Sequence, residues 1–201
     1  TQVPMLDIGQ GDCIHIRSNN RRLYLCDSGR TSKLQAGTWQ VIPFLKHQGV
    51  NRLELIFISH CDSDHISAIQ EILEWAGEGN LQIGGLVLSA SGPEDEMHAS
   101  LIAAAKKNGV PVSRMEAGDE IRRGNTIFQA VYPFSSENTS SPSGDNSFSS
   151  PVSSDRNASS LVLRFSEIRS ENPEAFAGNA SAPSLPGEVF SLLLTGDVEA
   201  S

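Results

Sequence analysis

Residues 59–65, with the sequence Ser-His-Cys-Asp-Ser-Asp-His, bring four metal-ligating side chains together. His60, Asp62, Asp64 and His65 supply two imidazoles and two carboxylates within six residues. This mixed set of nitrogen and oxygen donors suits Zn²⁺, Mn²⁺ or Fe²⁺ better than a thiolate-rich site would. A pair of such ions can activate a shared water as a nucleophile. The segment therefore predicts a metal site that could hydrolyse a substrate.

A simpler interpretation is that the same segment only begins a helix. Asp62 or Asp64 could then cap the free backbone N–H groups of the first turn, as aspartate often does. Capping accounts for one aspartate, but not for two aspartates between two histidines directly after an apolar run. We therefore favour the metal site over the helix cap.

The flanking residues indicate how this loop is positioned. Residues 53–59 form an apolar run typical of a buried strand, and residues 66–76 have apolar side chains at helical spacing. A loop at the end of a strand is where layered α/β proteins present functional groups. Further strands are expected at 3–8, 13–17, 23–26, 84–89, 110–115, 121–123, 126–132, 161–165 and 189–195, and further helices at 39–47 and 94–108. Strands first, then alternating helices and strands, favour a layered α/β or αββα domain.

The length of 201 residues suits a single domain, 1–201, with insertions. Low-complexity insertions are expected at about 135–158 and 166–188. The first is rich in serine and the second contains several prolines. Because neither carries many large apolar residues, neither can bury enough surface to offset its ordering entropy.

Composition excludes some classes of function. The net charge of −9 argues against broad electrostatic capture of nucleic acid by this chain alone. The three cysteines form no pattern typical of a disulfide framework or zinc knuckle, and Cys13 and Cys26 are expected to act as small apolar residues. No apolar run is long enough for a membrane helix. His15, His47 and His98 are expected to be surface or strand histidines.

The spacing of the metal-ligating residues resembles a known signature. His-x-Asp-x-Asp-His over residues 60–65 is similar to the H-x-H-x-D-H motif of the metallo-β-lactamase superfamily, and aspartate at the second position is characteristic of its ComEC family of DNA-internalization (competence) proteins. Five further segments resemble ComEC motifs in the same order: 5–12 (MLDIGQGD), 25–29 (LCDSG), 42–53 (IPFL and GVNRL), 157–163 (NASSLVL) and 194–197 (LTGD). The resemblance covers nearly the whole chain apart from the two insertions and implies a metallo-β-lactamase αββα sandwich.

The resemblance also implies roles for individual residues. His60 and Asp62 are expected to hold one metal ion and Asp64 and His65 a second, with Asp197 bridging the two. Zinc or manganese is expected, with no small-molecule cofactor. Asp62 and Asp64 are expected to take part in catalysis, and Asp64 also to orient or deprotonate the attacking water.

Three other polar residues are expected to contact the site from its edge. Asp27 is expected to position a ligand, although Asp-Ser-Gly could also be a simple turn. Asn157 stands where other superfamily members carry a histidine, so it is expected to be a weak ligand or a substrate contact. Asp12 is expected to shape a turn near the site more than to join its chemistry.

Two departures from the family pattern bear on activity. Cys61 and the pair Ser67-Ala68 replace residues that are usually small, proline or glycine. The family's downstream histidine motif is expected beyond Ser201, which predicts a sandwich incomplete at its C-terminal end. Weaker metal affinity and lower activity than in a complete domain are expected as a result.

The function implied by the resemblance is metal-dependent hydrolysis. The expected enzyme is a phosphodiesterase or nuclease that acts on DNA, with single-stranded DNA as the expected substrate, within a DNA-uptake channel. It is expected to degrade the strand that is not imported and to face outward from a bacterial plasma membrane, next to the membrane channel of the same parent protein. Two alternatives stay open: a hydrolase of a small ester, thioester or lactam, and a non-catalytic module that gates or stabilises the channel.

Overall fold

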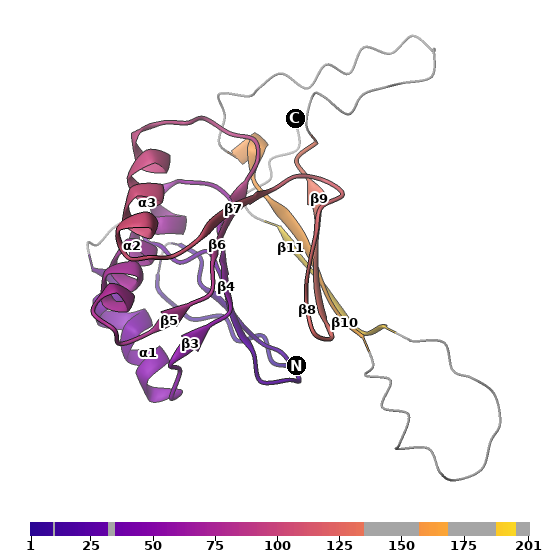
Figure 1. Ribbon diagram of the computed structural model, residues 1–201, viewed down its shortest axis with the longest axis horizontal. Coiled ribbons are helices and arrows are strands. Elements are labelled where there is room, and N and C mark those ends of the chain that lie inside the picture. The colour runs from indigo at the N-terminus through magenta and orange to yellow at the C-terminus, as the bar shows by residue number, and fades with distance from the viewer. Residues whose placement is uncertain (10, 32–34, 135–156, 169–187, 196–201) are drawn as a thin grey trace, which may run out of the picture.

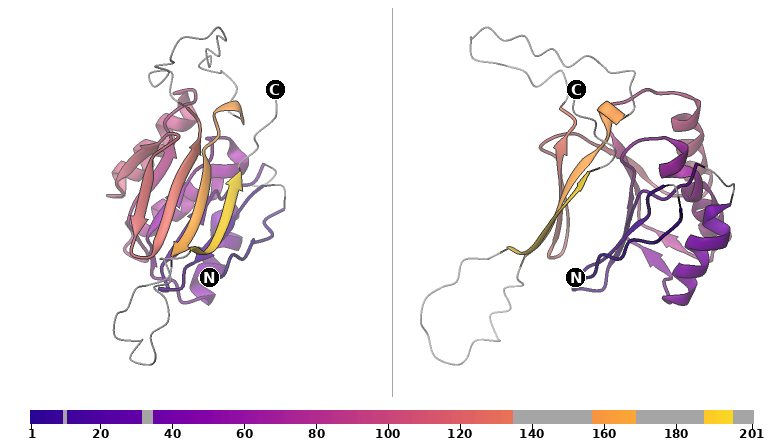
Figure 2. Two further views of the ribbon diagram at one scale, coloured as in Figure 1. Left: turned by 90° about the vertical axis from the view of Figure 1, so that its right-hand side faces the viewer. Right: turned by 180° about the vertical axis from the view of Figure 1, so that it is seen from behind.

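The computed structural model describes residues 1–201 except residue 10 and the ranges 32–34, 135–156, 169–187 and 196–201. The described residues form three layers: helices, a first sheet and a second sheet (Figure 1). The view from behind in Figure 2 shows the same order, with the helices on one face of the first sheet and the second sheet on its other face.

The first sheet has five strands in the order β1-β2-β4-β6-β7. Their bounds are β1 Ile14–Arg17, β2 Leu23–Cys26, β4 Leu55–Phe57, β6 Leu86–Ser89 and β7 Val112–Met115. β1 pairs with β2 in antiparallel fashion, and β2, β4, β6 and β7 run parallel. Parallel neighbours need crossover connections, which are usually helical. The carboxyl ends of the parallel strands therefore meet along one edge.

Helices cover one face of this sheet. They are α1 (Ile42–His47), preceded by a short π-helical turn η1 (Gly37–Val41), then α2 (Ser63–Gly77) and α3 (Glu96–Lys107). α2 connects β4 to β6 and α3 connects β6 to β7. A small parallel pair, β3 (Arg52–Leu53) and β5 (Gln82–Ile83), extends these connections. Pro43 lies in the first turn of α1, directly after the π-helical turn.

The second sheet is antiparallel, with the order β11-β10-β9-β8. Its strands are β8 (Glu120–Arg123), β9 (Thr126–Tyr132), β10 (Val162–Ile168) and β11 (Glu188–Thr195). The left view of Figure 2 shows all four strands side by side. Between β9 and β10 the short 3-10 helix η3 (Asn157–Ser159) leads back toward the first sheet.

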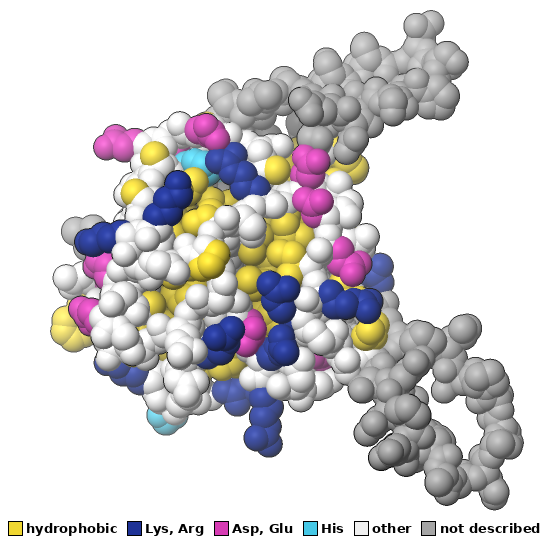
Figure 3. All heavy atoms as spheres, viewed as in Figure 1, with side chains coloured by type: hydrophobic (Ala, Val, Ile, Leu, Met, Phe, Trp, Pro, Cys, Tyr) yellow, Lys and Arg dark blue, Asp and Glu magenta, His cyan; other side chains and the backbone are white. Residues whose placement is uncertain are grey.

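Two cores hold the layers together. The first lies between the helices and the first sheet and consists mainly of aliphatic side chains. The second lies between the sheets around Phe128, whose ring centroid is 4.7 Å from that of Tyr24, 4.4 Å from that of Phe57 and 5.2 Å from that of Phe165. On the face shown in Figure 3, apolar side chains lie in the middle and charged side chains surround them.

The predicted α/β class is confirmed, and most expected elements are present. Three expectations were wrong. Residues 3–8 contain only an isolated bridge at Met5, and Gln2 forms another. Pro4, between the two bridges, has no N–H to extend a ladder. β10 continues to Ile168, so the second insertion cannot begin at 166. The helix expected from 39 begins as a π-helical turn at Gly37.

The predicted insertions at about 135–158 and 166–188 lie largely outside the described residues. Of the αββα sandwich, the described residues form one helical layer and both sheets. None of their helices combines the length and the hydropathy needed to cross a membrane.

Candidate metal centre

The site lies at the edge of the first sheet where β2 and β4 end. Asp27 directly follows β2, and its backbone N–H donates to the carbonyl oxygen of Phe57 at 2.9 Å. Its Oδ1 accepts a hydrogen bond of 2.7 Å from the backbone N–H of Ser59, which follows β4. Asp27 has a φ of +49°, a left-handed conformation that aspartate adopts more readily than most residues. One buried carboxylate thus ties the ends of two parallel strands together.

Glycines allow two loops to lie against the first turn of α2. A Cβ at Gly29 would lie 2.5 Å from the carbonyl carbon of Asp64, and one at Gly11 would lie 2.0 Å from the carbonyl oxygen of Gly29. The backbone N–H of Asp12 donates to Asp64 O at 3.4 Å, and that of Gly29 donates to Asp12 O at 3.2 Å. The segments around Gly11 and Gly29 therefore pack directly on the start of α2 and carry Asp12 and Asp27 to it.

His65 is fully buried, and its two ring nitrogens face different carboxylates. Nδ1 lies 3.1 Å from Oδ2 of Asp27, and Nε2 lies 3.9 Å from Oδ2 of Asp64. A carboxylate that accepts the Nδ1 proton fixes the tautomer in which Nε2 carries the lone pair. This arrangement presents Nε2 of His65 as a metal ligand on the side where Asp64 lies.

His60 has a matching arrangement. Its Nδ1 lies 3.0 Å from Oγ of Ser59 and 3.2 Å from Oγ of Ser160, and its Nε2 lies 3.5 Å from Oδ2 of Asp62. The ring centroids of His60 and His65 are 4.1 Å apart. Both buried imidazoles thus have Nδ1 against fixed polar groups and Nε2 toward a partly exposed carboxylate.

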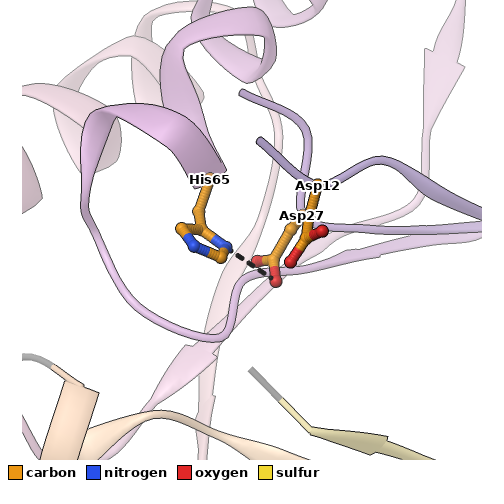
Figure 4. A group of neighbouring side chains, drawn as sticks. All are labelled: Asp12, Asp27 and His65. Atoms are coloured by element: carbon orange, nitrogen blue, oxygen red, sulfur yellow. Dashed lines mark ion pairs between the residues drawn. The ribbon is translucent and has the colours of Figure 1, made fainter. Parts of the chain in front are cut away.

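A fourth carboxylate, that of Asp12, lies beside Asp27 and His65. Asp12, Asp27 and His65 each offer a ligand atom, and these atoms all lie within 4.8 Å of one another (Figure 4). In Figure 4 the carboxylate of Asp12 points to the same space as that of Asp27. Neutral imidazole nitrogens and carboxylate oxygens without a thiolate form a donor set that suits Zn²⁺, Mn²⁺ or Fe²⁺. The residues present therefore fit a divalent metal centre.

Cys13 and Cys26 do not compete with this donor set as thiolates. Burial raises the pKa of Cys13 to about 11, although a hydrogen bond from Ser28 opposes the shift. Burial also raises the pKa of Cys26 well above its usual value, and the nearby Asp27 adds to the effect. Both thiols lie in the cores and are protonated at neutral pH, which confirms the expectation that they act as small apolar residues.

The structure brings the predicted site residues together in pairs. Nε2 of His60 lies beside Asp62 and Nε2 of His65 beside Asp64, with Asp27 behind His65. Among the described residues, the group whose three ligand atoms lie within 4.8 Å of one another is Asp12, Asp27 and His65, so of the four predicted ligands only His65 belongs to it. Asp62 is the N-cap residue of α2, but its side chain makes no capping hydrogen bond, so the helix-cap interpretation does not account for it.

The remaining predictions have different outcomes. The backbone of Asp12 joins its loop to α2 and to the loop of Gly29, and its carboxylate also lies near Asp27 and His65. Asn157 is half-buried on η3, and the hydroxyl that reaches His60 from this segment belongs to Ser160. Asp197 lies outside the described residues. His15 lies on β1 and His47 is exposed, as expected, but the expectation for His98 was wrong because it is buried on α3.

Sequence reasoning missed Ser59 and Ser160 as contacts of His60. Ser59 directly precedes a predicted ligand, so its contact with His60 could have been predicted from the sequence. Ser160 had no such signal, because it lies 100 residues further along the chain. Pairing of Leu161 N–H with the carbonyl oxygen of Ser59, at 2.8 Å, is what brings Ser160 to the site.

Comparison with known proteins identifies the family. A model described as the metallo-beta-lactamase superfamily matches residues 6–133, which include His60, Asp62, Asp64 and His65. The chain belongs to the metallo-β-lactamase superfamily.

Two curated relatives refine this assignment. ComE operon protein 3 of Bacillus subtilis (strain 168) is 28% identical over 176 residues, which cover 81% of this chain and 20% of that protein. Competence protein ComA of Neisseria gonorrhoeae is 36% identical over 84 residues, covering 42% of this chain and 11% of that protein. The predicted resemblance to ComEC-type competence proteins is thus confirmed. The chain spans about a fifth of the length of the first relative and about a tenth of the second.

A solved structure with a related fold is the metallo-β-lactamase with a HARLDQ motif from Cronobacter sakazakii. Its sequence identity is 13% and its TM-score is 0.46, and the match covers 81% of this chain and 54% of that one.

Proposed function

We propose that the chain is a binuclear metal-dependent hydrolase domain that cleaves phosphodiester bonds in DNA. The observation that carries the proposal is the shared orientation of His60 and His65. Both rings direct Nε2 toward a partly exposed aspartate, and both have Nδ1 held by buried groups. A purely structural histidine pair has no need of two acidic neighbours at its outer edge, whereas a metal site does.

The residues divide into two ligand pairs. His60 and Asp62 form the first pair, and Asp64 and His65 form the second, with Asp197 as the proposed bridging ligand. When bound, divalent zinc or manganese supplies an activated water and stabilises negative charge on the substrate. Asp64 is proposed to orient that water through its carboxylate and accept its proton.

Other residues of the chain act on the ligands. Asp27 holds the proton of His65 on Nδ1, and the hydroxyls of Ser59 and Ser160 fix the ring of His60. Groups of this kind orient a ligating imidazole and raise its basicity. Asp12 adds a further negative charge beside Asp27 and supports a centre with a total charge suited to two divalent ions.

The proposed substrate is a DNA strand during uptake. Support comes from the two relatives, one named as a ComE operon protein and the other as a competence protein. In this proposal the domain lies on the outer face of the bacterial membrane, next to a channel in the same parent protein, and degrades the strand that is not imported. Because the chain carries a net charge of −9, DNA binding has to depend on the metal centre, on local cations and on other parts of the parent protein.

A substrate panel tests this proposal. The chain, with bound Mn²⁺ or Zn²⁺ quantified first, is given linear single-stranded DNA, a chromogenic phosphodiester and the β-lactam nitrocefin. His60→Ala is measured beside it, and the exposed His47→Ala is the control. We expect metal-dependent cleavage of DNA and of the phosphodiester that is lost only in His60→Ala. Faster turnover of nitrocefin than of DNA would indicate a small-molecule hydrolase, and bound metal with no turnover would indicate a gating module.

A further inference from the structure

A recess adjoins His60 on the side away from Asp27. It is lined by the loop after β6, the start of α3 and the end of β7, and its polar lining residues include His60, Ser91, His98, Arg114 and Ser159. The metal-ligand pairs proposed above use none of these residues except His60. The recess therefore extends the site along the same sheet edge, beyond the carboxyl ends of β6 and β7.

Arg114 is the cation of this recess. Its Nη2 lies 2.7 Å from Oε1 of Glu94 and 3.5 Å from Nε2 of His98. Both of these contacts use one nitrogen of a guanidinium that has five N–H donors. The side chain of Arg114 is 40% exposed, so its remaining donors can reach a ligand in the recess. Figure 3 shows a histidine beside basic side chains near the edge where Figure 1 places α3 and β7.

His98 supports Arg114 without adding a second charge. Burial lowers the pKa of His98, and the neighbouring Arg114 lowers it further. The neutral ring can accept a hydrogen bond from the guanidinium at Nε2. Its position is fixed because its backbone N–H donates to Oδ1 of Asp95, the N-cap residue of α3, at 3.0 Å.

Glu94 is a replaceable partner. Its side chain is 71% exposed, and ion pairs between exposed groups contribute little because solvent screens them. A phosphate oxygen could therefore take the place of the Glu94 carboxylate on Arg114. The guanidinium geometry suits two oxygens of one phosphate, which a rotating glutamate does not match as well.

In the wall of the recess, the loop after β6 lies close to η3. Gly92 has a φ of +123°, and a Cβ there would lie 3.0 Å from Oγ of Ser159. Oγ of Ser89 donates to the carbonyl oxygen of Ser159 at 2.7 Å, and the backbone N–H of Ser91 donates to Oγ of Ser89 at 3.2 Å. These contacts tie the loop after β6 to η3, the segment that also carries Ser160 to His60.

We propose that this recess is a subsite for a phosphate of the DNA strand next to the one at the metal centre, with Arg114 as the binding residue and Glu94 as the group that the phosphate displaces. The proposal rests on the proposed function for the nature of the ligand. An acidic chain needs a local cation to hold a polyanion beside its site, and Arg114 supplies one within the recess that His60 lines. A neighbouring phosphate bound there would fix the position of the DNA strand along its length relative to the metal centre.

The test measures binding without catalysis. A short fluorescein-labelled single-stranded oligonucleotide is titrated with the chain in EDTA and followed by fluorescence anisotropy over a series of salt concentrations. The variants are Arg114→Gln and Glu94→Gln. The controls are Arg122→Gln and Glu120→Gln, an exposed pair on β8 with Nε to Oε1 at 3.7 Å and the same changes in net charge. Urea denaturation checks that each variant is folded.

We expect Arg114→Gln to weaken binding about five- to tenfold, as for loss of one charge-assisted hydrogen bond at a partly exposed site. For Arg114→Gln, the slope of the logarithm of the association constant against the logarithm of the salt concentration should be shallower than that of the wild type by about 0.7, the value for one phosphate contact to a single strand. Glu94→Gln should tighten binding more than Glu120→Gln does. Equal effects in the two pairs, or no measurable binding by the folded wild-type chain, would overturn the subsite. Because no metal is present, neither result depends on whether the chain hydrolyses DNA.

Discussion

Replacing Asp27 by asparagine changes one atom at the base of the metal centre. Asparagine tolerates the left-handed backbone at this position and keeps an oxygen that can accept from the N–H of Ser59. The atom facing Nδ1 of His65, however, becomes an NH₂ donor. Nδ1 must then accept a hydrogen bond, so the ring proton moves to Nε2, the nitrogen proposed to bind metal.

The size of the effect follows from this switch of tautomer. Loss of a carboxylate that orients a ligating histidine typically weakens metal binding about 10- to 100-fold. Folding stability should change much less, by about 1 kcal/mol, because the hydrogen bond to Ser59 is kept and one buried contact is altered. The prediction is therefore a large loss of metal affinity with a small loss of stability.

The assay is a competition titration of Mn²⁺ and Zn²⁺ against a chromophoric chelator, with urea denaturation of the metal-free protein in parallel. Asp7→Asn is the matched control, because Oδ1 of Asp7 also accepts from a backbone N–H, that of Gly9 at 3.0 Å, but the residue is exposed. If Asp27→Asn bound metal as tightly as Asp7→Asn, the positioning role of Asp27 would be refuted.

Three further predictions concern stability. His15 is buried with neither ring nitrogen hydrogen-bonded in the described structure, and burial lowers its pKa to about 4. The unfolded chain therefore binds a proton at this residue more readily than the folded chain does. Between pH 7 and pH 5, the free energy of unfolding measured in urea should fall by about 2 kcal/mol more in the wild type than in His15→Leu. Gly29→Ala should lower the free energy of unfolding by about 2 kcal/mol or more and weaken metal binding, because its Cβ meets the backbone of α2. The control is Gly85→Ala, whose Cβ meets a movable side-chain methyl at 3.3 Å and which should not affect metal binding. Phe128→Ala should lower the free energy of unfolding by about 3–5 kcal/mol, measured by urea denaturation, because it empties the centre of the core between the sheets.

Strands with a clear apolar pattern were predictable from sequence. Residues 23–26 match β2, in which every residue is buried, and residues 126–132 match β9, in which buried residues alternate with more exposed ones along most of the strand. Residues 3–8 are also apolar, but a strand needs a continuous ladder, and only an isolated bridge at Met5 forms there. The hydropathy of a segment does not show that a residue such as Pro4, which has no N–H, interrupts the ladder.

The site was predictable where its residues are neighbours in sequence. His60 to His65 share one loop, so their convergence follows from the strand before it and the helix after it. Ser160 and Arg114 reach the same sheet edge only through strand pairing and helix crossovers, which local patterns do not encode. The burial of His98 likewise depends on how α3 packs, so its sequence position suggested an ordinary surface residue.

The most direct test of the central claim is Mn²⁺-dependent cleavage of linear single-stranded DNA by the chain beside Asp62→Asn, with metal content measured in both. The account predicts that cleavage requires the metal, stops in EDTA and falls by about 100-fold or more in Asp62→Asn, because loss of a proposed metal ligand should cost at least as much as loss of a group that only orients one. Undiminished cleavage by the variant, or none by the metal-loaded wild type, would contradict it.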